Sequence, residues 1–347
     1  MRAIVTGATG MVGSHLIRAL SKKHGKDSVI ALTNKFTQER NGPRDRLLRE
    51  SGVCRVPIDF LEAQPLGSEL GDYDVVYHLA ANLRTDLRDD ETDSPMRIND
   101  LGTSRLIERL GDSLRGKLLI YTSSVAAVDR QTADGAPMNE QSPCVPRTLY
   151  GKTKLAGEEL IIEAAKRLGF RYAIFRLGTV YGTNCREGHI FDRFTQWVRR
   201  GDLQGRILWP GKISLIYVDD VVDVLCAAID MPALQNEIFF LAHDEEITVG
   251  EWAGVMAEAM GLKRSFISIP EIFATPLRWL FYQFWFWKRM PQSFALAAWR
   301  LSLIMSDGLY CDNSKLKRAY PKEYIDARNG VRKAYRMSEE EKVESPA

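Results

Sequence analysis

Tyr150 and Lys154 lie four residues apart in "YGKTK", and this pair is the first candidate for chemistry in the chain. Residues at this spacing share one face of a helix. A free tyrosine has a pKa of about 10 and is a poor base near neutrality, but a neighbouring ammonium favours the phenolate and lowers that pKa. The pair predicts a general acid/base for the proton of an alcohol, although the same spacing also occurs in ordinary surface pairs.

Three glycines in "TGATGMVGSHL", residues 6 to 16, predict a binding site for a dinucleotide. They follow the apolar run "RAIVT" and precede an amphipathic stretch, so we place them in a strand-to-helix turn whose N–H groups face an anion. Gly7 would take a positive φ, and Gly10 would let the backbone approach a pyrophosphate. Gly13 would let the helix pack closely on the sheet.

A third candidate is the stretch "YTSS", residues 121 to 124, which ends another apolar run. Its hydroxyls are expected at the same sheet edge as the glycine loop, because the carboxyl ends of parallel strands meet there. A serine in this place could hydrogen-bond a substrate oxygen opposite the tyrosine. The alternative is a strand-end cap with no chemical role.

The elements that would position these residues alternate between apolar strands and amphipathic helices. Strands that are apolar on both faces and alternate with helices predict a parallel sheet covered on both sides. We therefore predict an α/β fold: a Rossmann doubly wound parallel sheet with a smaller C-terminal substrate-binding subdomain. Strands are expected near 2–6, 28–33, 52–60, 74–81, 116–124, 170–182 and 236–243, helices near 11–25, 99–112 and 150–169, and a strand followed by a helix at 214–230.

The alternation becomes irregular from about residue 180, which suggests where the subdomain begins. We expect the Rossmann domain at residues 1–178 plus about 214–242. The substrate subdomain is expected at about 179–213 and 243–335. Residues 336–347 are charged and are expected to form a frayed tail.

Composition narrows the class of protein. The 347 residues include 47 basic and 45 acidic ones, a balance that gives no reason to expect a nucleic-acid partner. The five cysteines contain no CxxC pair, so we expect neither a metal site nor a disulfide framework, and a reducing compartment fits best. The N-terminal "MRAIVTG" already reads as a strand rather than a signal peptide, and no stretch of about 18 apolar residues is present. A cytoplasmic protein is expected.

Taken together, the motifs resemble the extended short-chain dehydrogenases/reductases, also called the NAD-dependent epimerase/dehydratase family. The resemblance covers about residues 1 to 330. It rests on motifs in the family's order and spacing: "TGATGMVG", "VYHLAA", "NDLGT", "YTSS", "YGKTK", "RLGTVYG" and "YVDDVVDV".

This resemblance implies roles for individual residues. Tyr150 matches the catalytic acid/base, Lys154 the lysine that lowers its pKa and holds the nicotinamide ribose, and Ser124 the serine that orients the substrate oxygen. Ser123 is the next candidate for that serine, and His78 matches a packing position. Cofactor contacts are implied for Gly7, Thr9, Gly10, Met11, Val12, Gly13, Asp59, Phe60, Leu79, Ala80, Ala81, Asn99, Thr122, Tyr150, Lys154, Leu177, Gly178 and Val180. The alternative for Asn99 is a helix cap.

The end of the second strand bears on the choice of cofactor. An NAD enzyme places a carboxylate there to bind the ribose 2′-hydroxyl. Here the strand ends in Thr33 and Asn34, followed by Lys35, and Arg40 and Arg44 lie close in sequence. These residues favour NADP(H), with Lys35 pairing with the 2′-phosphate. The alternative is a neutral pocket that accepts NAD(H) as well.

Departures from the family pattern bear on the substrate. Leu177 and Thr183 replace two usual prolines, and "TSSVAAV" lacks the Asp-Glu pair of a 4,6-dehydratase. Sugar-nucleotide enzymes tend to place an arginine before the "VDD" strand to hold the diphosphate, whereas this chain has only Lys212 there. Other basic residues that could serve are Arg193, Arg199, Arg200 and Arg206.

We therefore expect a hydroxysteroid dehydrogenase-like oxidoreductase that interconverts a secondary alcohol and a ketone on an apolar, steroid-, terpenoid- or lipid-like substrate. One alternative is a nucleotide-sugar epimerase, which uses the same residues without net redox change. The other is a non-catalytic dinucleotide-sensing regulator on the same fold. An intact Ser/Tyr/Lys set argues against the regulator.

An aromatic segment at residues 272–290 needs its own explanation. It is followed by a second apolar stretch at 294–305. Three interpretations compete: a lid over an apolar substrate, an interfacial helix pair at a membrane surface, and a core or subunit contact. We expect residues 272–305 to cover the substrate at a membrane surface or at the face of a homodimer. The crowded aromatic residues are Trp279, Phe281, Tyr282, Phe284, Trp285, Phe286 and Trp287.

Overall fold

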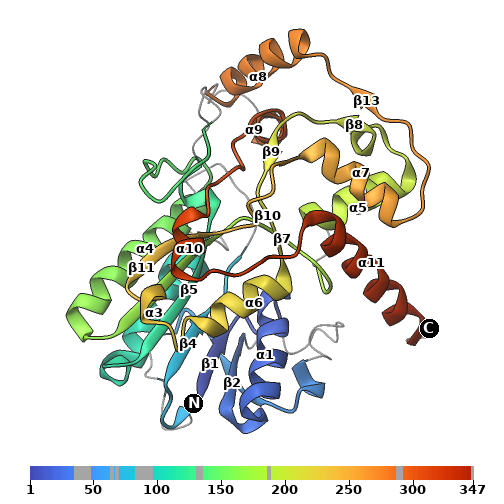
Figure 1. Cartoon of the computed structure of the whole chain (residues 1–347). Coiled ribbons are helices and arrows are strands. Elements are labelled where there is room, and N and C mark those ends of the chain that lie inside the picture. Colours follow the sequence, from blue (N-terminus) through green and yellow to red (C-terminus); the bar gives the residue numbers. More distant parts are fainter. Residues whose placement is uncertain are drawn as a thin grey trace.

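A seven-stranded parallel sheet forms the centre of the molecule (Figure 1). The computed structural model describes residues 1–34, 48–62, 66, 70–82, 97–129, 136–185, 189–286 and 292–344. The strand order is β11-β6-β5-β4-β1-β2-β3, and every neighbouring pair is parallel. The strands are β1 (Ala3–Thr6), β2 (Val29–Asn34), β3 (Cys54–Ile58), β4 (Val75–His78), β5 (Leu118–Ser124), β6 (Arg171–Leu177) and β11 (Glu237–Leu241).

Helices cover both faces of this sheet, as the sequence predicts. α1 (Met11–His24) and α6 (Val218–Ala227) contact each other on one face, and α3 (Arg97–Leu110) and α4 (Leu149–Leu168) on the other. Alternate residues of a strand point to opposite faces, and β1 follows this rule. Ala3 and Val5 belong to the apolar cluster beneath α1 and α6, whereas Ile4 belongs to the cluster beneath α3 and α4. The predicted doubly wound Rossmann fold is confirmed.

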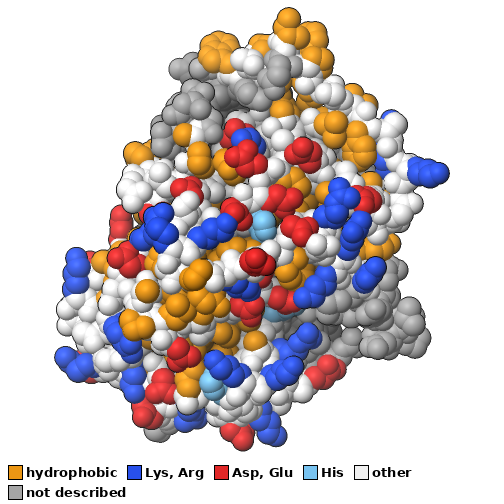
Figure 2. Space-filling model, viewed as in Figure 1, with side chains coloured by type: hydrophobic (Ala, Val, Ile, Leu, Met, Phe, Trp, Pro, Cys, Tyr) orange, Lys and Arg blue, Asp and Glu red, His pale blue; other side chains and the backbone are white. Residues whose placement is uncertain are grey.

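Short strand pairs and helices make up the C-terminal part. β7 pairs with β10, β8 with β13 and β9 with β12. At the far end of the molecule α8 and α9 pack against each other, and apolar side chains gather there on the surface (Figure 2). The elements are β7 (Thr179–Tyr181), α5 (Ile190–Arg200), β8 (Ile207–Leu208), β9 (Lys212–Ile213), β10 (Leu215–Tyr217), β12 (Ile247–Thr248), α7 (Val249–Ala259), β13 (Ile267–Ser268), α8 (Glu271–Phe286), α9 (Gln292–Met305), α10 (Ser314–Ala319) and α11 (Ala327–Glu344).

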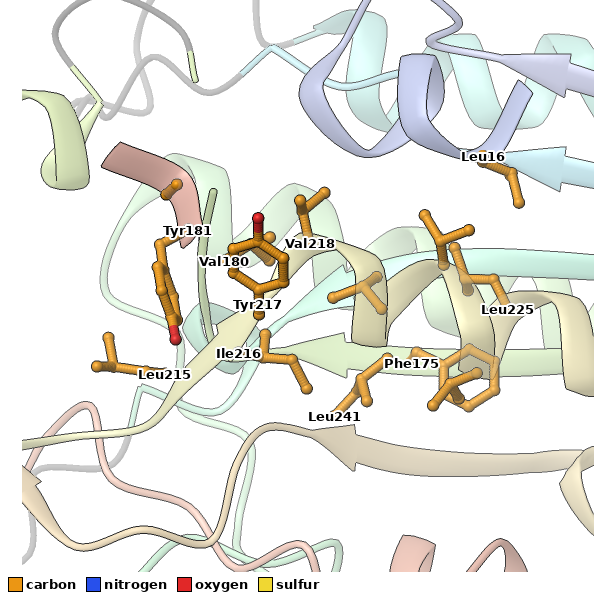
Figure 3. Close-up of a cluster of buried hydrophobic side chains, with 14 of the residues drawn as sticks. Leu16, Phe175, Val180, Tyr181, Leu215, Ile216, Tyr217, Val218, Leu225 and Leu241 are labelled. Atoms are coloured by element: carbon orange, nitrogen blue, oxygen red, sulfur yellow. The ribbon is translucent and has the colours of Figure 1, made fainter. Parts of the chain in front are cut away.

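One apolar cluster runs from the sheet into this C-terminal part (Figure 3). Phe175 of β6 and Leu225 of α6 belong to it, as do Tyr181 and Tyr217 of the β7–β10 pair. The fully buried Trp252 of α7 packs edge-to-face against Tyr181, with 6.2 Å between the ring centroids. The apolar core is continuous between the sheet and the C-terminal part, so it marks no boundary between two domains. The domain boundaries expected from the sequence stay a prediction. α11 extends to Glu344, through residues for which the sequence predicts fraying.

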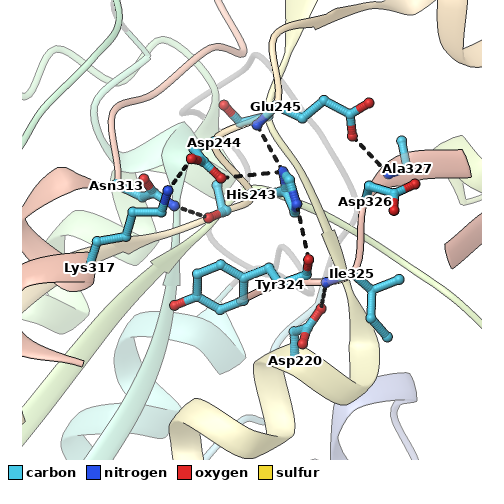
Figure 4. A network of polar contacts seen from close by, with 12 residues as sticks. Asp220, His243, Asp244, Glu245, Asn313, Lys317, Tyr324, Ile325, Asp326 and Ala327 are labelled. Atoms are coloured by element: carbon cyan, nitrogen blue, oxygen red, sulfur yellow. Dashed lines mark hydrogen bonds and ion pairs between the residues drawn. The ribbon is translucent and has the colours of Figure 1, made fainter. Parts of the chain in front are cut away.

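A polar network fastens the chain after α10 to the carboxyl end of β11 (Figure 4). His243 Nδ1 accepts the Glu245 N–H at 2.8 Å, so Nε2 bears the proton and donates to the Tyr324 carbonyl at 3.3 Å. The Glu245 carboxylate accepts the Ala327 N–H, the first residue of α11, at 2.8 Å. Below them, Asp220 accepts the Ile325 N–H at 2.9 Å and binds Lys322 Nζ at 2.8 Å. These contacts position α11 over α6 and α7.

Replacing Asp220 with alanine should destabilise the protein by about 2 kcal/mol, because a buried carboxylate with two partners is lost. Asp223 gives a matched control, since its exposed carboxylate binds the same Lys322. Asp223→Ala should cost about 0.5 kcal/mol. Chemical denaturation of both variants measures the difference; equal losses would mean that Asp220 does not fasten this segment.

Candidate active site

The glycine loop between β1 and α1 is shaped by close backbone contacts. Gly7 has a φ of +68°, and a Cβ there would lie 2.7 Å from the Ala80 nitrogen and from the Leu79 carbonyl carbon. A Cβ on Gly13 would lie 2.2 Å from the Gly7 carbonyl oxygen. The positive φ of Gly7 agrees with the sequence analysis. The close packing at Gly13 is against the loop itself rather than against the sheet.

The start of α1 presents its backbone N–H groups beside this loop. Gly10 is the N-cap residue, and no side chain of the described residues caps the helix there. The first bond of the helix is from the Ser14 N–H to the Gly10 carbonyl at 2.9 Å. The N–H groups of Met11, Val12 and Gly13 therefore lie outside the helix ladder, at its positive end. This cradle fits a pyrophosphate group.

Thr6 joins the glycine loop to the end of β4. Its hydroxyl oxygen accepts the N–H groups of Leu79 and Ala80, each at 3.1 Å, so its own proton is donated to His78 Nδ1 at 2.9 Å. His78 Nε2 therefore bears the ring proton and donates to Thr103 Oγ1 at 2.8 Å. Burial lowers the pKa of His78 to about 3, which keeps the ring neutral. His78 serves packing and hydrogen bonding, as the family resemblance implies.

Tyr150 and Ser124 meet where β5 and α4 approach each other. The Thr148 hydroxyl caps α4 by accepting the Gly151 N–H at 3.0 Å, which places Tyr150 in the first turn. A Cβ on Gly151 would lie 2.2 Å from the Ala126 carbonyl oxygen, so this turn lies directly on the residues after β5. Tyr150 is half-buried, and desolvation of its hydroxyl raises its pKa to about 12, while the neighbouring Ser124 hydroxyl acts to lower it.

The structure distinguishes the two candidate serines. Ser124 lies beside Tyr150 and also accepts the Ala126 N–H at 3.2 Å, so the strand-end cap and the contact with tyrosine occur together. Ser123 is buried and donates to Glu158 Oε1 at 2.5 Å, eight residues further along α4 than Tyr150. Only Ser124 is therefore placed to contact a substrate oxygen next to Tyr150.

Lys154 is buried one turn further along α4. Its Nζ donates to the Thr122 carbonyl at 2.8 Å and lies 4.7 Å from the centre of the Tyr121 ring. The distance from Nζ to the centre of the Tyr150 ring is 6.0 Å. Burial lowers the pKa of Lys154 to about 7, and Glu158 opposes this shift. The pKa of Tyr150 is set by desolvation and by Ser124, so a lowering by Lys154 stays a prediction.

Glu158 lies on α4 four residues after Lys154, on the same face of the helix, and the sequence analysis did not single it out. It forms a buried ion pair with Arg176 of β6: Oε1 accepts from Nε at 3.0 Å and Oε2 from Nη2 at 2.7 Å. Tyr150, Lys154 and Glu158 are spaced by four residues and share one face of α4. The spacing that indicates the Tyr150–Lys154 pair could therefore also have indicated Glu158. Its partner, 18 residues further on, has no such local signal.

Asn99 links the exit of β4 to the first turn of α4. Its Oδ1 accepts the Asn82 N–H at 2.7 Å, and its Nδ2 donates to the Asn82 carbonyl at 3.0 Å and to Thr153 Oγ1 at 3.2 Å. Thr153 in turn donates to the Tyr150 carbonyl at 2.9 Å. Asn99 lies inside α3, so it is not a helix cap. Its amide is engaged with the protein and supports the site rather than presenting a free group to a cofactor.

Most of the remaining predicted residues lie at the same carboxyl edge. Thr33 ends β2 with a buried hydroxyl that has no partner among the described residues, and Asn34 beside it is partly exposed. Lys35, Arg40 and Arg44 fall outside the described residues. The other residues with exposed or half-buried positions at this edge are Thr9, Met11, Val12, Ala80, Ala81, Leu177 and Gly178.

Two predicted cofactor residues, Phe60 and Val180, are buried, and Asp59 is engaged with neighbouring protein groups. Phe60 is buried in the apolar cluster under α3 and α4, so its ring packs in the core. Asp59 uses Oδ1 to accept the Leu61 N–H at 2.9 Å, and its carbonyl accepts from Arg109 at 2.7 Å. Val180 is buried as well, in the cluster that reaches into the C-terminal part. A buried orphan hydroxyl on Thr33 and an open cradle at Gly7–Gly13 nevertheless fit a dinucleotide.

The basic residues considered for a diphosphate have other partners. Lys212 Nζ binds Glu246 at 2.8 Å and lies 5.2 Å from the centre of the Tyr310 ring. Arg206 donates to the Ser265 carbonyl and hydroxyl at 3.1 and 2.9 Å. Arg193, Arg199 and Arg200 lie on α5, where Arg193 stacks over Trp197 at 5.2 Å.

The sheet order, the glycine loop and the Ser–Tyr–Lys set are those of an extended short-chain dehydrogenase/reductase. The chain matches the model of the NAD dependent epimerase/dehydratase family over residues 3–242, and it belongs to that family. No described helix combines the length and the hydropathy needed to span a membrane.

Several relatives are nucleotide-sugar enzymes by name. The chain is 27% identical to UDP-glucose 4-epimerase of Vibrio cholerae over 262 residues, which cover 74% of this chain and 75% of the relative. It is 29% identical to an uncharacterized UDP-glucose epimerase of Bacillus subtilis over 273 residues, or 76% and 83% of the two chains. Methionine adenosyltransferase 2 subunit beta of Xenopus tropicalis is 26% identical over a stretch that covers 80% of this chain and 78% of the relative.

Solved structures share the fold. UDP-glucuronic acid 4-epimerase from Bacillus cereus, in complex with UDP-glucuronic acid and NAD, superposes with a TM-score of 0.74 at 20% identity. The superposition covers 98% of this chain and 99% of that one. Similarity at this level of identity establishes the architecture alone.

These comparisons correct the expected activity. A hydroxysteroid dehydrogenase-like enzyme for an apolar substrate is wrong, because the relatives are UDP-glucose and UDP-glucuronate 4-epimerases. The motifs at the sheet edge are common to both activities, and the apolar substrate was inferred from the aromatic segment beyond the family match and from the lack of an arginine before the "VDD" strand. The preference for NADP(H) is not supported either, since the similar solved structures hold NAD.

The buried neighbours Lys154 and Glu158 on α4 yield a prediction on pH dependence. The pKa of Lys154 is about 7 in the folded protein, against an ordinary value of 10.5. Between pH 7 and pH 10.5 folding therefore releases the Lys154 proton. The contribution of Lys154 to the free energy of unfolding rises with pH across that range. Glu158→Gln removes the charge that raises the Lys154 pKa, so the pKa should fall further. NMR titration of the Lys154 Nζ resonance measures it.

Glu159 supplies the matched control, because it is the adjacent residue and its side chain is exposed. Glu159→Gln should leave the Lys154 titration unchanged. An unchanged titration in Glu158→Gln would contradict the electrostatic link between the two buried residues.

Proposed function

We propose that this protein is a nucleotide-sugar 4-epimerase that uses NAD(H), with Ser124, Tyr150 and Lys154 as its catalytic residues. Membership in the epimerase/dehydratase family supports the proposal, as do relatives that are named UDP-glucose and UDP-glucuronate 4-epimerases. The observation on which it chiefly rests is that the first turn of α4, which carries Tyr150, lies directly on the residues that follow Ser124, at the sheet edge that also holds the glycine loop.

In this proposal Tyr150 exchanges the proton of the sugar hydroxyl at C4. Its phenolate accepts that proton as the C4–H bond breaks, and it returns the proton when the hydroxyl forms again with the opposite configuration. NAD, held by the Gly7–Gly13 loop and the start of α1, would supply reversible hydride transfer at C4, so no net redox change results. Ser124 hydrogen-bonds the C4 oxygen in both states.

The resting pKa values suggest how the proton transfer is switched on. Burial keeps Tyr150 protonated, with a pKa of about 12, and favours neutral Lys154. A positive charge placed beside the phenol favours the phenolate. Oxidised nicotinamide would supply such a charge, and so would protonated Lys154, whose Nζ lies 6.0 Å from the centre of the Tyr150 ring.

The activity is tested by incubating the purified protein with NAD and, in separate reactions, UDP-glucose and UDP-glucuronate. Chromatography of the products should detect the C4 epimer of at least one sugar, with no lasting rise in absorbance at 340 nm. Steady accumulation of reduced cofactor without any epimer would refute the proposal.

Tyr150→Phe should lower the epimerisation rate by about 10²- to 10⁴-fold, because the proton carrier is lost while the ring still packs. NAD binding, followed by calorimetry, should stay within a few fold. Tyr172→Phe is the control, since Tyr172 lies near the amino end of β6, away from the carboxyl edge. A Tyr150→Phe variant with half of the wild-type rate would exclude the assigned role.

The cofactor proposal makes its own prediction. NAD(H) should bind at least as tightly as NADP(H) in calorimetry, and Asn34→Asp should weaken NADP(H) further, because a carboxylate at this partly exposed strand end repels the 2′-phosphate. Asn34 is a better choice than Thr33, whose buried side chain would place an unpaired carboxylate in the core. Tighter binding of NADP(H) by the unmodified protein would overturn the proposal.

A second candidate is a non-catalytic regulator that binds the dinucleotide. The similarity to methionine adenosyltransferase 2 subunit beta favours it, since that relative is named as a subunit of another enzyme. The complete Ser124, Tyr150 and Lys154 set favours the enzyme. Turnover of any nucleotide sugar that is lost in Tyr150→Phe would decide for catalysis.

A further inference from the structure

Apolar residues on the inner side of the α8–α9 pair hold it on the body of the molecule. Ala274 of α8 and Met305 of α9 belong to the main apolar cluster, and Leu277 and Ile304 pack against it. α8 and α9 contact each other along their lengths at the end of the molecule farthest from the N-terminus (Figure 1). This inner side accounts for the attachment of the pair.

The outer side of α8 is apolar as well, and it is open to water. Ile272, Phe273, Trp279 and Leu280 are between 40% and 77% exposed, and Phe294 at the start of α9 is 47% exposed. Their spacing of about seven residues places the α8 members on one face, opposite Ala274 and Leu277. These five account for half of the ten large hydrophobic residues that the described part of the chain leaves exposed, so the outer face is a concentrated patch (Figure 2).

Charge distinguishes between the surfaces that could cover this patch. Residues 272–305 contain four basic residues, Arg278, Lys288, Arg289 and Arg300, and no Asp or Glu, although the whole chain is nearly balanced. Arg300 is exposed, and its pKa is lowered by partial burial and by the nearby Arg193, so positive charges adjoin each other at this end. A symmetric contact with a second copy would bring this basic segment against itself, with Glu271, the first residue of α8, as the one acidic residue in the sequence of the pair.

An anionic lipid surface matches both the apolar character of the patch and the positive charge of the segment. Tryptophan and phenylalanine partition to the boundary between head groups and acyl chains, while basic side chains attract anionic head groups. Since no described helix can span a bilayer, the pair would lie in the plane of the interface. We propose that the outer face of α8, together with Phe294 at the start of α9, forms a peripheral docking surface for anionic membranes and inserts among the lipids. This inference does not depend on the proposed epimerase activity.

Co-sedimentation of the full chain with vesicles tests the proposal. Vesicles of 70% phosphatidylcholine and 30% phosphatidylserine should pellet the protein, pure phosphatidylcholine vesicles should pellet at least fivefold less, and salt at about 0.5 M should reduce the binding. Absence of binding to the anionic vesicles, or equal binding to both kinds, would overturn it.

Two variants locate the contact. Phe273→Ala combined with Trp279→Ala should reduce the pelleted fraction severalfold, whereas Leu203→Ala, at a residue that is 59% exposed outside this segment, should bind as the unmodified protein does. Both proteins should retain the same nucleotide-sugar turnover, so failure here is distinguishable from failure of the proposed function. A concentration-dependent dimer in analytical ultracentrifugation that the double variant abolishes would assign the patch to a second copy instead.

Discussion

The close approach of two backbones at Gly7 constrains the whole carboxyl edge of the sheet. The loop after β1 passes so near the end of β4 that a Cβ on Gly7 would contact the Leu79–Ala80 peptide at 2.7 Å. The Thr6 hydroxyl fastens the same two segments through three hydrogen bonds. Because β1 and β4 are thereby fixed side by side, α1 begins with its unpaired N–H groups at the edge where β5 also ends.

The second half of the site depends on how α4 is seated. The absence of a side chain at Gly151 lets the first turn of α4 lie on the Ala126 carbonyl, which brings Tyr150 to Ser124. Further along, the Glu158–Arg176 pair and Ser123 tie the helix to β5 and β6. Breaking a buried ion pair of this kind typically costs about 3–5 kcal/mol, so the position of the Tyr–Lys–Glu row is strongly determined.

The correction of the expected substrate has a structural basis. The tyrosine, lysine and serine act on the carbon that bears the hydroxyl, whatever the rest of the substrate contains. Those motifs therefore indicate the type of reaction and do not identify the substrate. The aromatic segment suggested an apolar substrate, but its described side chains on α8 are largely exposed on the outer surface rather than buried over Tyr150. They are better understood as a feature of the protein surface.

The sequence by itself determined the sheet, the glycine loop and the Tyr150–Lys154 pair, because each follows from a local period of two or four residues or from a strand–turn–helix order. Tertiary structure alone decided which serine meets the tyrosine, which nitrogen of His78 bears the proton, and that Asn99 supports the site. It also revealed Glu158 with Arg176, and it set the pKa values of Tyr150 and Lys154 by burial. These properties come from contacts between residues 17 to 73 positions apart, and from the exclusion of water that such contacts produce, neither of which a local pattern records.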